Sequence, residues 1–162
     1  MGVSVGDRLP EADLLVIGEN GPEVVALGPL LAGRKVVIFG LPGAFTRTCS
    51  AAHLPSFIRT RPALADKGVD EVICIAVNDP FVMQAWGAAT GATDAGITML
   101  ADAGAAFTKA IGMAFTAPPA GFYDRSMRYA LMAEDGVIKL LNIEVKRGVC
   151  ELSSGETMLG QL

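Results

Sequence analysis

Residues 35–50 read KVVIFGLPGAFTRTCS, and this stretch joins the pattern of a strand to a cysteine. Its first six residues form a short apolar run ended by glycine, which predicts a strand. A Pro-Gly turn follows, and Cys49 comes where the next helix would begin. We predict that this helix starts at about Thr48 and is kinked or broken at Pro55 or Pro62, because proline removes a backbone donor.

Further strand and helix patterns alternate along the chain on both sides of this stretch. Residues 71–77 (EVICIAV) are continuously apolar, as in a strand covered on both faces. The other expected strands are 12–17, 98–101, 129–134 and 137–144, and the expected helices are 80–90, 105–111 and the chain end. Strands that alternate with helices and lead into a hairpin predict an α/β fold with a mixed sheet.

Three local signals add detail to this outline. Asp135-Gly136 favours a type I′ hairpin turn, in which both central residues need a positive φ. Ser153 and Glu156 have the spacing of a capping box, which predicts that the last helix begins at Ser153. Residues 112–128 form the longest stretch without a clear pattern, and we expect a loop there, of a length that is often functional.

The composition is that of one folded domain over residues 1–162. The chain is 51% hydrophobic and 19% charged, which excludes disorder, and its net charge of −4 argues against a nucleic-acid partner. No apolar run reaches transmembrane length and the start lacks a signal-peptide pattern, so we expect no membrane partner. Three cysteines, an odd count, exclude a fully paired disulfide framework and favour a reducing, cytoplasmic location.

Cys49 is the residue whose position carries chemistry. The N–H groups and positive dipole end of a helix start stabilise an anion, so a thiol there can be held as the nucleophilic thiolate. Thr46 lies three residues earlier, and its hydroxyl can both donate and accept a hydrogen bond. This pair suits a small substrate with two adjacent oxygen atoms.

The same residues resemble a known family signature. Pro42, Thr46 and Cys49 meet the peroxiredoxin pattern Pro-x-x-x-Thr-x-x-Cys, and PGAFT-x-TCS with the following HLPSF is similar to the type II, atypical two-cysteine branch. Residues 68–86 (GVDEVICIAVNDPFVMQAW) and 128–144 (RYALMAEDGVIKLLNIE) also resemble that branch. The resemblance implies a thioredoxin-like fold and an enzyme that reduces hydrogen peroxide and alkyl hydroperoxides in peroxide detoxification.

The resemblance also implies roles for particular residues. Cys49 would be the peroxidatic cysteine, which becomes a sulfenic acid when it attacks the peroxide. Thr46 would hydrogen-bond the peroxide, and Pro42 would pack over the site and limit the access of water. Arg128, at the start of the hairpin, would match the active-site arginine, whose permanent charge stabilises the thiolate and the peroxide oxygen.

A second thiol must then resolve the sulfenic acid of Cys49 before excess peroxide oxidises it further. Cys150 follows a glycine in a charged segment and resembles the resolving cysteine of animal enzymes of this branch, whereas Cys74 matches a position used in plant members. Cys74 is also compatible with a purely structural role in a buried strand. Glutathione, glutaredoxin or thioredoxin are the reductants that the resemblance implies, and any of them could act directly on Cys49.

Two residues near Cys49 leave alternatives open. Arg47 stands where the family usually has proline, and its charge either acts on Cys49 or is simply solvated. His53 is either a structural hydrogen-bonding residue or a base for the thiol, and we expect no metal and no cofactor because paired ligand motifs are absent.

Type II enzymes commonly dimerise through loops around the active site, which would place Phe45 and Phe81 in a homodimer contact.

The same cysteine chemistry would also serve a protein of another class. A peroxide sensor or redox relay would pass the oxidation of Cys49 to a partner protein instead of turning over peroxide. A thioredoxin-type disulfide reductase is disfavoured, because it needs a Cys-x-x-Cys pair and Thr46 occupies the matching position.

Overall fold

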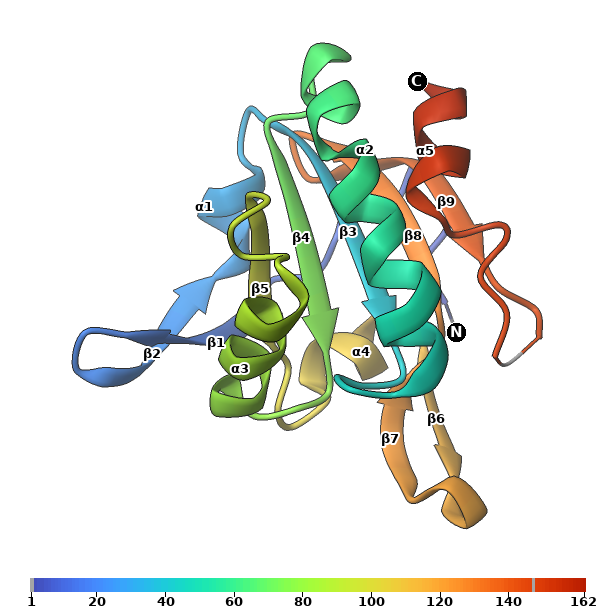
Figure 1. Cartoon of the computed structure of the whole chain (residues 1–162). Helices are drawn as coiled ribbons and strands as arrows, with labels where there is room; N and C mark the ends of the chain where they lie inside the picture. The colour runs from blue at the N-terminus through green and yellow to red at the C-terminus, as the bar shows by residue number, and fades with distance from the viewer. Residues whose placement is uncertain (1, 147) are drawn as a thin grey trace.

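A mixed β-sheet crosses the computed structural model, which describes residues 2–146 and 148–162 (Figure 1). The strand order is β2-β1-β5-β4-β3-β8-β9, with β3, β4 and β5 parallel and the other neighbouring pairs antiparallel. The bounds are β1 Asp13–Gly18, β2 Gly21–Ala26, β3 Lys35–Leu41, β4 Glu71–Ala76, β5 Ile97–Ala101, β8 Tyr129–Glu134 and β9 Val137–Ile143. The predicted α/β fold with a central mixed sheet is therefore confirmed.

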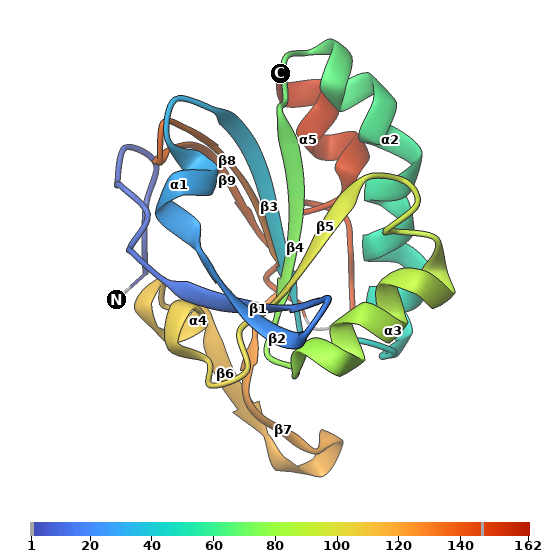
Figure 2. The same cartoon turned by 90° about the vertical axis from the view of Figure 1, so that its left-hand side faces the viewer.

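Helices cover both faces of this sheet, as the view in Figure 2 shows. One face carries α2 (Leu54–Asp66), α3 (Pro80–Thr90) and α5 (Gly155–Gln161), and the other carries α1 (Leu27–Leu31) and α4 (Ala106–Ala110). Each face has its own core, and alternate residues of β3 enter one or the other: Val37 and Phe39 pack beneath α2, and Val36 and Ile38 pack on the opposite side. This two-sided burial explains why the strand has no polar face.

The helix after β3 starts with a π-helical turn, Cys49–His53, before it continues as α2. The N–H of Leu54 donates to the carbonyl of Cys49 five residues earlier, which widens this turn. The helix continues through both prolines, so the predicted break is wrong, while the alternative of a kink stays a prediction. Pro55 follows the π turn directly and removes one backbone donor without ending the helix, and Pro62 lies on an exposed side, where solvent can reach the carbonyl that loses its donor.

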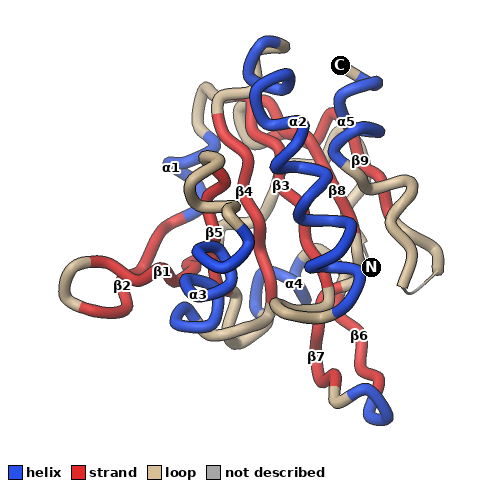
Figure 3. The backbone as a smooth tube through the Cα atoms, in the orientation of Figure 1, coloured by secondary structure: helices blue, strands red, loops and turns tan. Residues whose placement is uncertain are grey.

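The region expected to be a long loop, residues 112–128, is largely a β-hairpin. β6 (Ala114–Ala117) and β7 (Phe122–Ser126) pair antiparallel around a short 3-10 turn, Pro118–Ala120. The hairpin projects beyond the end of the main sheet at which β3 and β4 finish (Figures 1 and 3). The expectation of irregular structure was wrong because backbone pairing, which needs no side-chain pattern, holds these short strands.

The local signals had mixed outcomes. Asp135 and Gly136 have φ values of 50° and 77°, so the turn with two positive φ angles is confirmed. The last helix is capped by Ser154, whose hydroxyl accepts from the N–H of Thr157, and the predicted cap at Ser153 is wrong because the Ser153 hydroxyl donates to Glu144. Among the described residues, no helix combines the length and apolarity needed to cross a membrane.

Candidate functional site

Cys49 lies just beyond the carboxyl end of β3, in the first turn of the helix, as predicted. Its side chain is fully buried in the core beneath α2. The first N–H groups of a helix lack acceptors within it and carry partial positive charge. The backbone around Cys49 therefore favours negative charge on the sulfur.

Arg128 reaches Cys49 from the residue just before β8, as the resemblance implied. Its Nη2 donates to the sulfur of Cys49 over 3.3 Å, and its Nη1 lies 3.1 Å from Nδ1 of His53. The arginine is only 6% exposed, so little solvent screens its charge. The carbonyl of Arg128 accepts from the N–H of Glu144, which fixes the backbone that carries the guanidinium.

His53 is buried on the other side of that guanidinium. Its Nε2 lies 3.0 Å from the carbonyl oxygen of Ser153, and its ring packs against Phe39 and Phe57, which stack on each other, at centroid distances of 5.1 and 5.7 Å. Burial, and then the positive charge of Arg128, lower the pKa of His53 to about 3. The histidine is therefore neutral at physiological pH, which fits a hydrogen-bonding role and disagrees with a base whose pKa lies near 7.

Thr46 and Pro42 belong to the loop that connects β3 to the helix. The hydroxyl of Thr46 is half-buried and donates to the carbonyl of Gly43 over 2.8 Å, while Pro42 is buried. Two residues that the sequence analysis did not identify hold this loop. Arg125 donates to the carbonyl of Pro42 over 3.0 Å, and the side-chain oxygen of Asn78 accepts from the N–H of Ala44.

One of these two residues had a usable signal in the sequence. Asn78 follows β4, and residues that follow neighbouring parallel strands meet at the same edge of a sheet, so its position beside the loop after β3 was predictable. Arg125 comes from the projecting hairpin, which was not predicted. A Cβ at Gly43 would collide with Nη1 of Arg125, so this close approach needs glycine.

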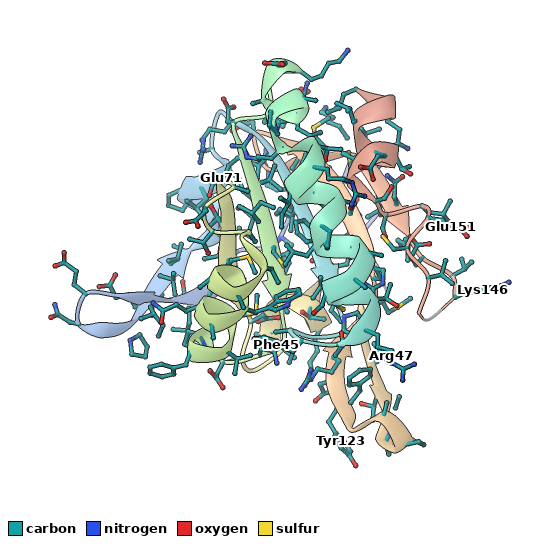
Figure 4. The ribbon with its side chains drawn as sticks, in the orientation of Figure 1. Phe45, Arg47, Glu71, Tyr123, Lys146 and Glu151 are labelled. Carbon is teal, nitrogen blue, oxygen red and sulfur yellow. The ribbon has the colours of Figure 1, made fainter. Side chains whose placement is uncertain are left out.

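A cavity of about 360 Å³ lies beside the start of the helix, next to Thr48 and Arg128, and the buried Cys49 does not line it. Its lining residues are Pro42, Thr46, Arg47, Thr48, Ala120, Phe122, Arg128 and Gly148. A second cavity of about 310 Å³ shares Pro42, Arg128 and Gly148 with the first. Arg47 is exposed at the start of the helix, near Phe45, which lies on the same side in Figure 4.

The other two cysteines occupy very different surroundings. Cys74 is fully buried in β4 opposite Phe39, and burial, followed by the charge of Cys49, raises its pKa well above the ordinary value. Cys150 is half-buried in a loop, and burial raises its pKa too, although the charge of Arg128 acts in the opposite direction. All three cysteines are free thiols in this structure.

The loop that carries Cys150, residues 144–146 and 148–153, reaches the start of the helix. We call it the Cys150 loop; Figure 4 shows it extending from β9 with Lys146 and Glu151 labelled. The carbonyl of Gly148 accepts from the Thr48 hydroxyl over 3.0 Å. The Glu144 carboxylate accepts from the N–H of Glu151 and from both the N–H and the hydroxyl of Ser153, over 2.6–3.0 Å. The loop is thus fixed at both ends beside Arg128.

Comparisons with known proteins agree with this arrangement. The Redoxin family model matches residues 4–159. Peroxiredoxin-2E-2, chloroplastic, of Oryza sativa subsp. japonica is 46% identical over 164 residues, which cover 99% of this chain and 72% of that protein. Peroxiredoxin-2B of Arabidopsis thaliana is 38% identical over 161 residues, covering 99% and 98%.

Solved structures give the same result. Reduced Prx3 from Vibrio vulnificus in complex with hydrogen peroxide is 44% identical with a TM-score of 0.90, covering 98% of each chain. Peroxiredoxin 5 from Alvinella pompejana is 29% identical with a TM-score of 0.83, covering 97% of this chain and 96% of that one.

The thioredoxin-like sheet and the redoxin match together define the class, that of the thiol-based oxidoreductases. Within that class the chain belongs to the peroxiredoxin family, in its type II branch. It is a thiol-dependent peroxidase that reduces peroxides at the expense of thiol reductants, in peroxide detoxification. A sensor or relay function is not favoured, because the relatives are named as peroxiredoxins.

Proposed function

We propose that Cys49 is the nucleophile that attacks the peroxide. Its thiolate attacks one oxygen, the O–O bond breaks, and water or an alcohol leaves after taking up a proton. The sulfur is oxidised by two electrons to a sulfenic acid while the peroxide is reduced. The observation that carries this assignment is the 3.3 Å contact between Nη2 of Arg128 and the sulfur, which supports negative charge on a buried atom.

Thr46 and Pro42 complete the proposed site. The Thr46 hydroxyl already donates its proton to Gly43, so its oxygen is available to accept from a peroxide O–H. Arg128 would then stabilise the charge that moves onto the leaving oxygen. Pro42 lines both cavities beside Arg128 and gives the site an apolar wall, which suits hydrogen peroxide and small alkyl hydroperoxides as substrates.

We propose Cys150 as the resolving thiol. Its thiol condenses with the sulfenic acid of Cys49, which forms a disulfide and releases water. Cys150 is half-buried in a loop that contacts Thr48, next to Cys49, whereas Cys74 lies in a strand paired on both sides, so its movement would break the sheet. A disulfide needs Cα atoms within about 7 Å, so this step requires Cys150 and Cys49 to come within that distance.

Three further features belong to the proposal. Thioredoxin, glutaredoxin or glutathione would return the oxidised enzyme to the dithiol form.

Phe45 and Phe81 are 58% and 59% exposed, and a homodimer that buries them would remove two large apolar side chains from water. The odd number of cysteines supports a cytoplasmic location.

The test combines turnover with mass spectrometry under non-reducing conditions. Peroxide consumption is measured with either thioredoxin or the pair of glutathione and glutaredoxin as the reductant. We expect Cys49→Ser to abolish this activity and Cys74→Ser, the matched control, to retain it. After one equivalent of hydrogen peroxide, a Cys49–Cys150 link supports the proposed resolution. A Cys49–Cys74 link or a glutathione adduct would show that Cys74 or glutathione, and not Cys150, resolves the sulfenic acid. Normal turnover by Cys49→Ser would refute the assignment of Cys49 as the nucleophile.

A further inference from the structure

His53 is the only histidine of the chain, and both of its ring nitrogens are engaged. It lies at the end of the π turn that begins with Cys49, with its ring fully buried against two phenylalanines that stack on each other. A histidine placed only to fill the core would have no reason to contact the arginine that holds the sulfur of Cys49. This double engagement raises the question of what the ring does for Arg128.

The partners of the two nitrogens determine where the proton sits. The carbonyl of Ser153 can only accept, so Nε2 must carry the N–H that it receives over 3.0 Å. A neutral imidazole has a single N–H, so Nδ1 presents a lone pair, and it accepts from Nη1 of Arg128 over 3.1 Å. A proton on Nδ1 would instead face the guanidinium, and burial together with Arg128 disfavours that form.

This contact fixes the direction of the guanidinium. Arg128 is held at its backbone by Glu144, at Nη1 by His53, and at Nη2 it meets Cys49. An arginine side chain loses rotamer freedom when it is ordered, and a planar group fixed at one nitrogen has its other nitrogen fixed too. The hydrogen bond to Nδ1 therefore aims Nη2 at the sulfur.

We propose that His53 is a positioning residue of the peroxidase reaction, which acts through Arg128 by the lone pair of Nδ1. The inference rests on the proposed roles of Cys49 and Arg128. The competing interpretation is that His53 serves only to tie the helix to Ser153. The two interpretations use different nitrogens, so they are separable.

Two amide substitutions of His53 separate the hydrogen bond of Nδ1 from the hydrogen bond of Nε2. In His53→Asn, the side-chain oxygen falls near the position of Nδ1 and can still accept from Arg128, while the bond to Ser153 is lost. In His53→Gln, the side-chain nitrogen falls near the position of Nε2 and can still donate to Ser153, while the acceptor for Arg128 is lost. Each variant serves as the matched control for the other, and thermal unfolding measured on both checks that they fold.

The measured quantity is the second-order rate of Cys49 oxidation by hydrogen peroxide in the reduced enzyme. The signal is stopped-flow fluorescence of Trp86, whose Nε1 donates to the hydroxyl of Ser50 beside Cys49. We expect His53→Gln to lower the rate roughly ten- to a hundredfold, as the loss of a charge-assisted hydrogen bond implies, and His53→Asn to retain most of it. Equal rates in the two variants, or the reverse order, would overturn the inference.

A double-mutant cycle shows whether the effect passes through Arg128. Once Arg128→Ala has removed the guanidinium, we expect His53→Gln to change the rate no further. A second, additive loss in that background would mean that His53 acts by another path. If Arg128→Ala itself leaves the oxidation rate unchanged, the proposed function fails. If Arg128→Ala lowers the oxidation rate and His53→Gln does not, only the positioning role of His53 is contradicted.

Discussion

The burial of His53 in its neutral form makes the stability of the protein depend on pH. The pKa of His53 is about 3 in the folded chain and 6.5 as the reference for an exposed histidine. Between these values the unfolded chain binds a proton that the folded chain does not, so acid favours unfolding. Stability is complete above pH 6.5 and falls as the pH decreases, by at most about 1.4 kcal/mol per pH unit.

The effect of His53 on stability is tested between pH 7.5 and pH 4.5. From the two pKa values, the wild-type free energy of unfolding falls by about 3 kcal/mol over this range, a large part of the roughly 5–15 kcal/mol of a typical domain. Below pH 4.5 Glu144 contributes as well: burial opposes its charge, but hydrogen bonds from Ser153 lower its pKa, so protonation then costs further stability.

The assay is urea denaturation of the reduced protein at half-unit pH steps, for the wild type and for His53→Asn. Because the variant lacks the titrating group, we expect the difference in unfolding free energy between the two to shrink steadily toward pH 4.5. Contributions shared by both proteins cancel in that difference. A constant difference across the window would refute the neutral buried state, and a difference that grew in acid would indicate an imidazolium paired with a carboxylate.

Two other substitutions test the surroundings of the site. Gly40→Ala places a Cβ against the ring of the buried Tyr129, so we expect overpacking to lower the free energy of unfolding by about 1–3 kcal/mol, measured in urea. An unchanged midpoint would contradict this. Glu144→Gln removes the charge that three donors of the Cys150 loop share, so we expect alkylation of Cys150 by iodoacetamide, followed by mass spectrometry, to become several-fold faster. Labelling of Cys150 at the wild-type rate would show that the carboxylate does not restrain the loop.

The central strands were predictable because burial on two faces leaves a strong trace in the sequence. β3, β4 and β8 have apolar runs with glycine or charge at their ends, and the predicted limits agree with the structure to within one residue. β2 left no such trace, because three successive residues of this edge strand are exposed and Pro22 interrupts the pattern. An edge strand and a projecting hairpin depend on backbone pairing, which side-chain periodicity does not report.

The candidate site divides in the same way. Cys49, Thr46 and Pro42 lie within one short segment, so spacing and family resemblance identify them together. Arg128 is 79 residues from Cys49 in the chain, and only the resemblance pointed to it. The contact between Arg128 and His53 follows from the π turn and from the antiparallel pairing of β3 with β8, neither of which a one-dimensional pattern encodes.

These contacts form a closed ring of four residues, and the sulfur of Cys49 is attached to that ring through Arg128. Cys49 contacts Arg128, Arg128 contacts His53, His53 contacts Ser153, and Ser153 contacts Glu144, whose N–H returns to the carbonyl of Arg128. Under the proposed resolution by Cys150, the thiol that approaches Cys49 belongs to the same loop that supplies Ser153 and Glu144 to this ring. Oxidation to the sulfenic acid replaces the thiolate by a neutral group and weakens its bond to Arg128. Under this proposal the chemical step weakens the contact between Cys49 and Arg128, while the bonds among Arg128, His53, Ser153 and Glu144 stay in place.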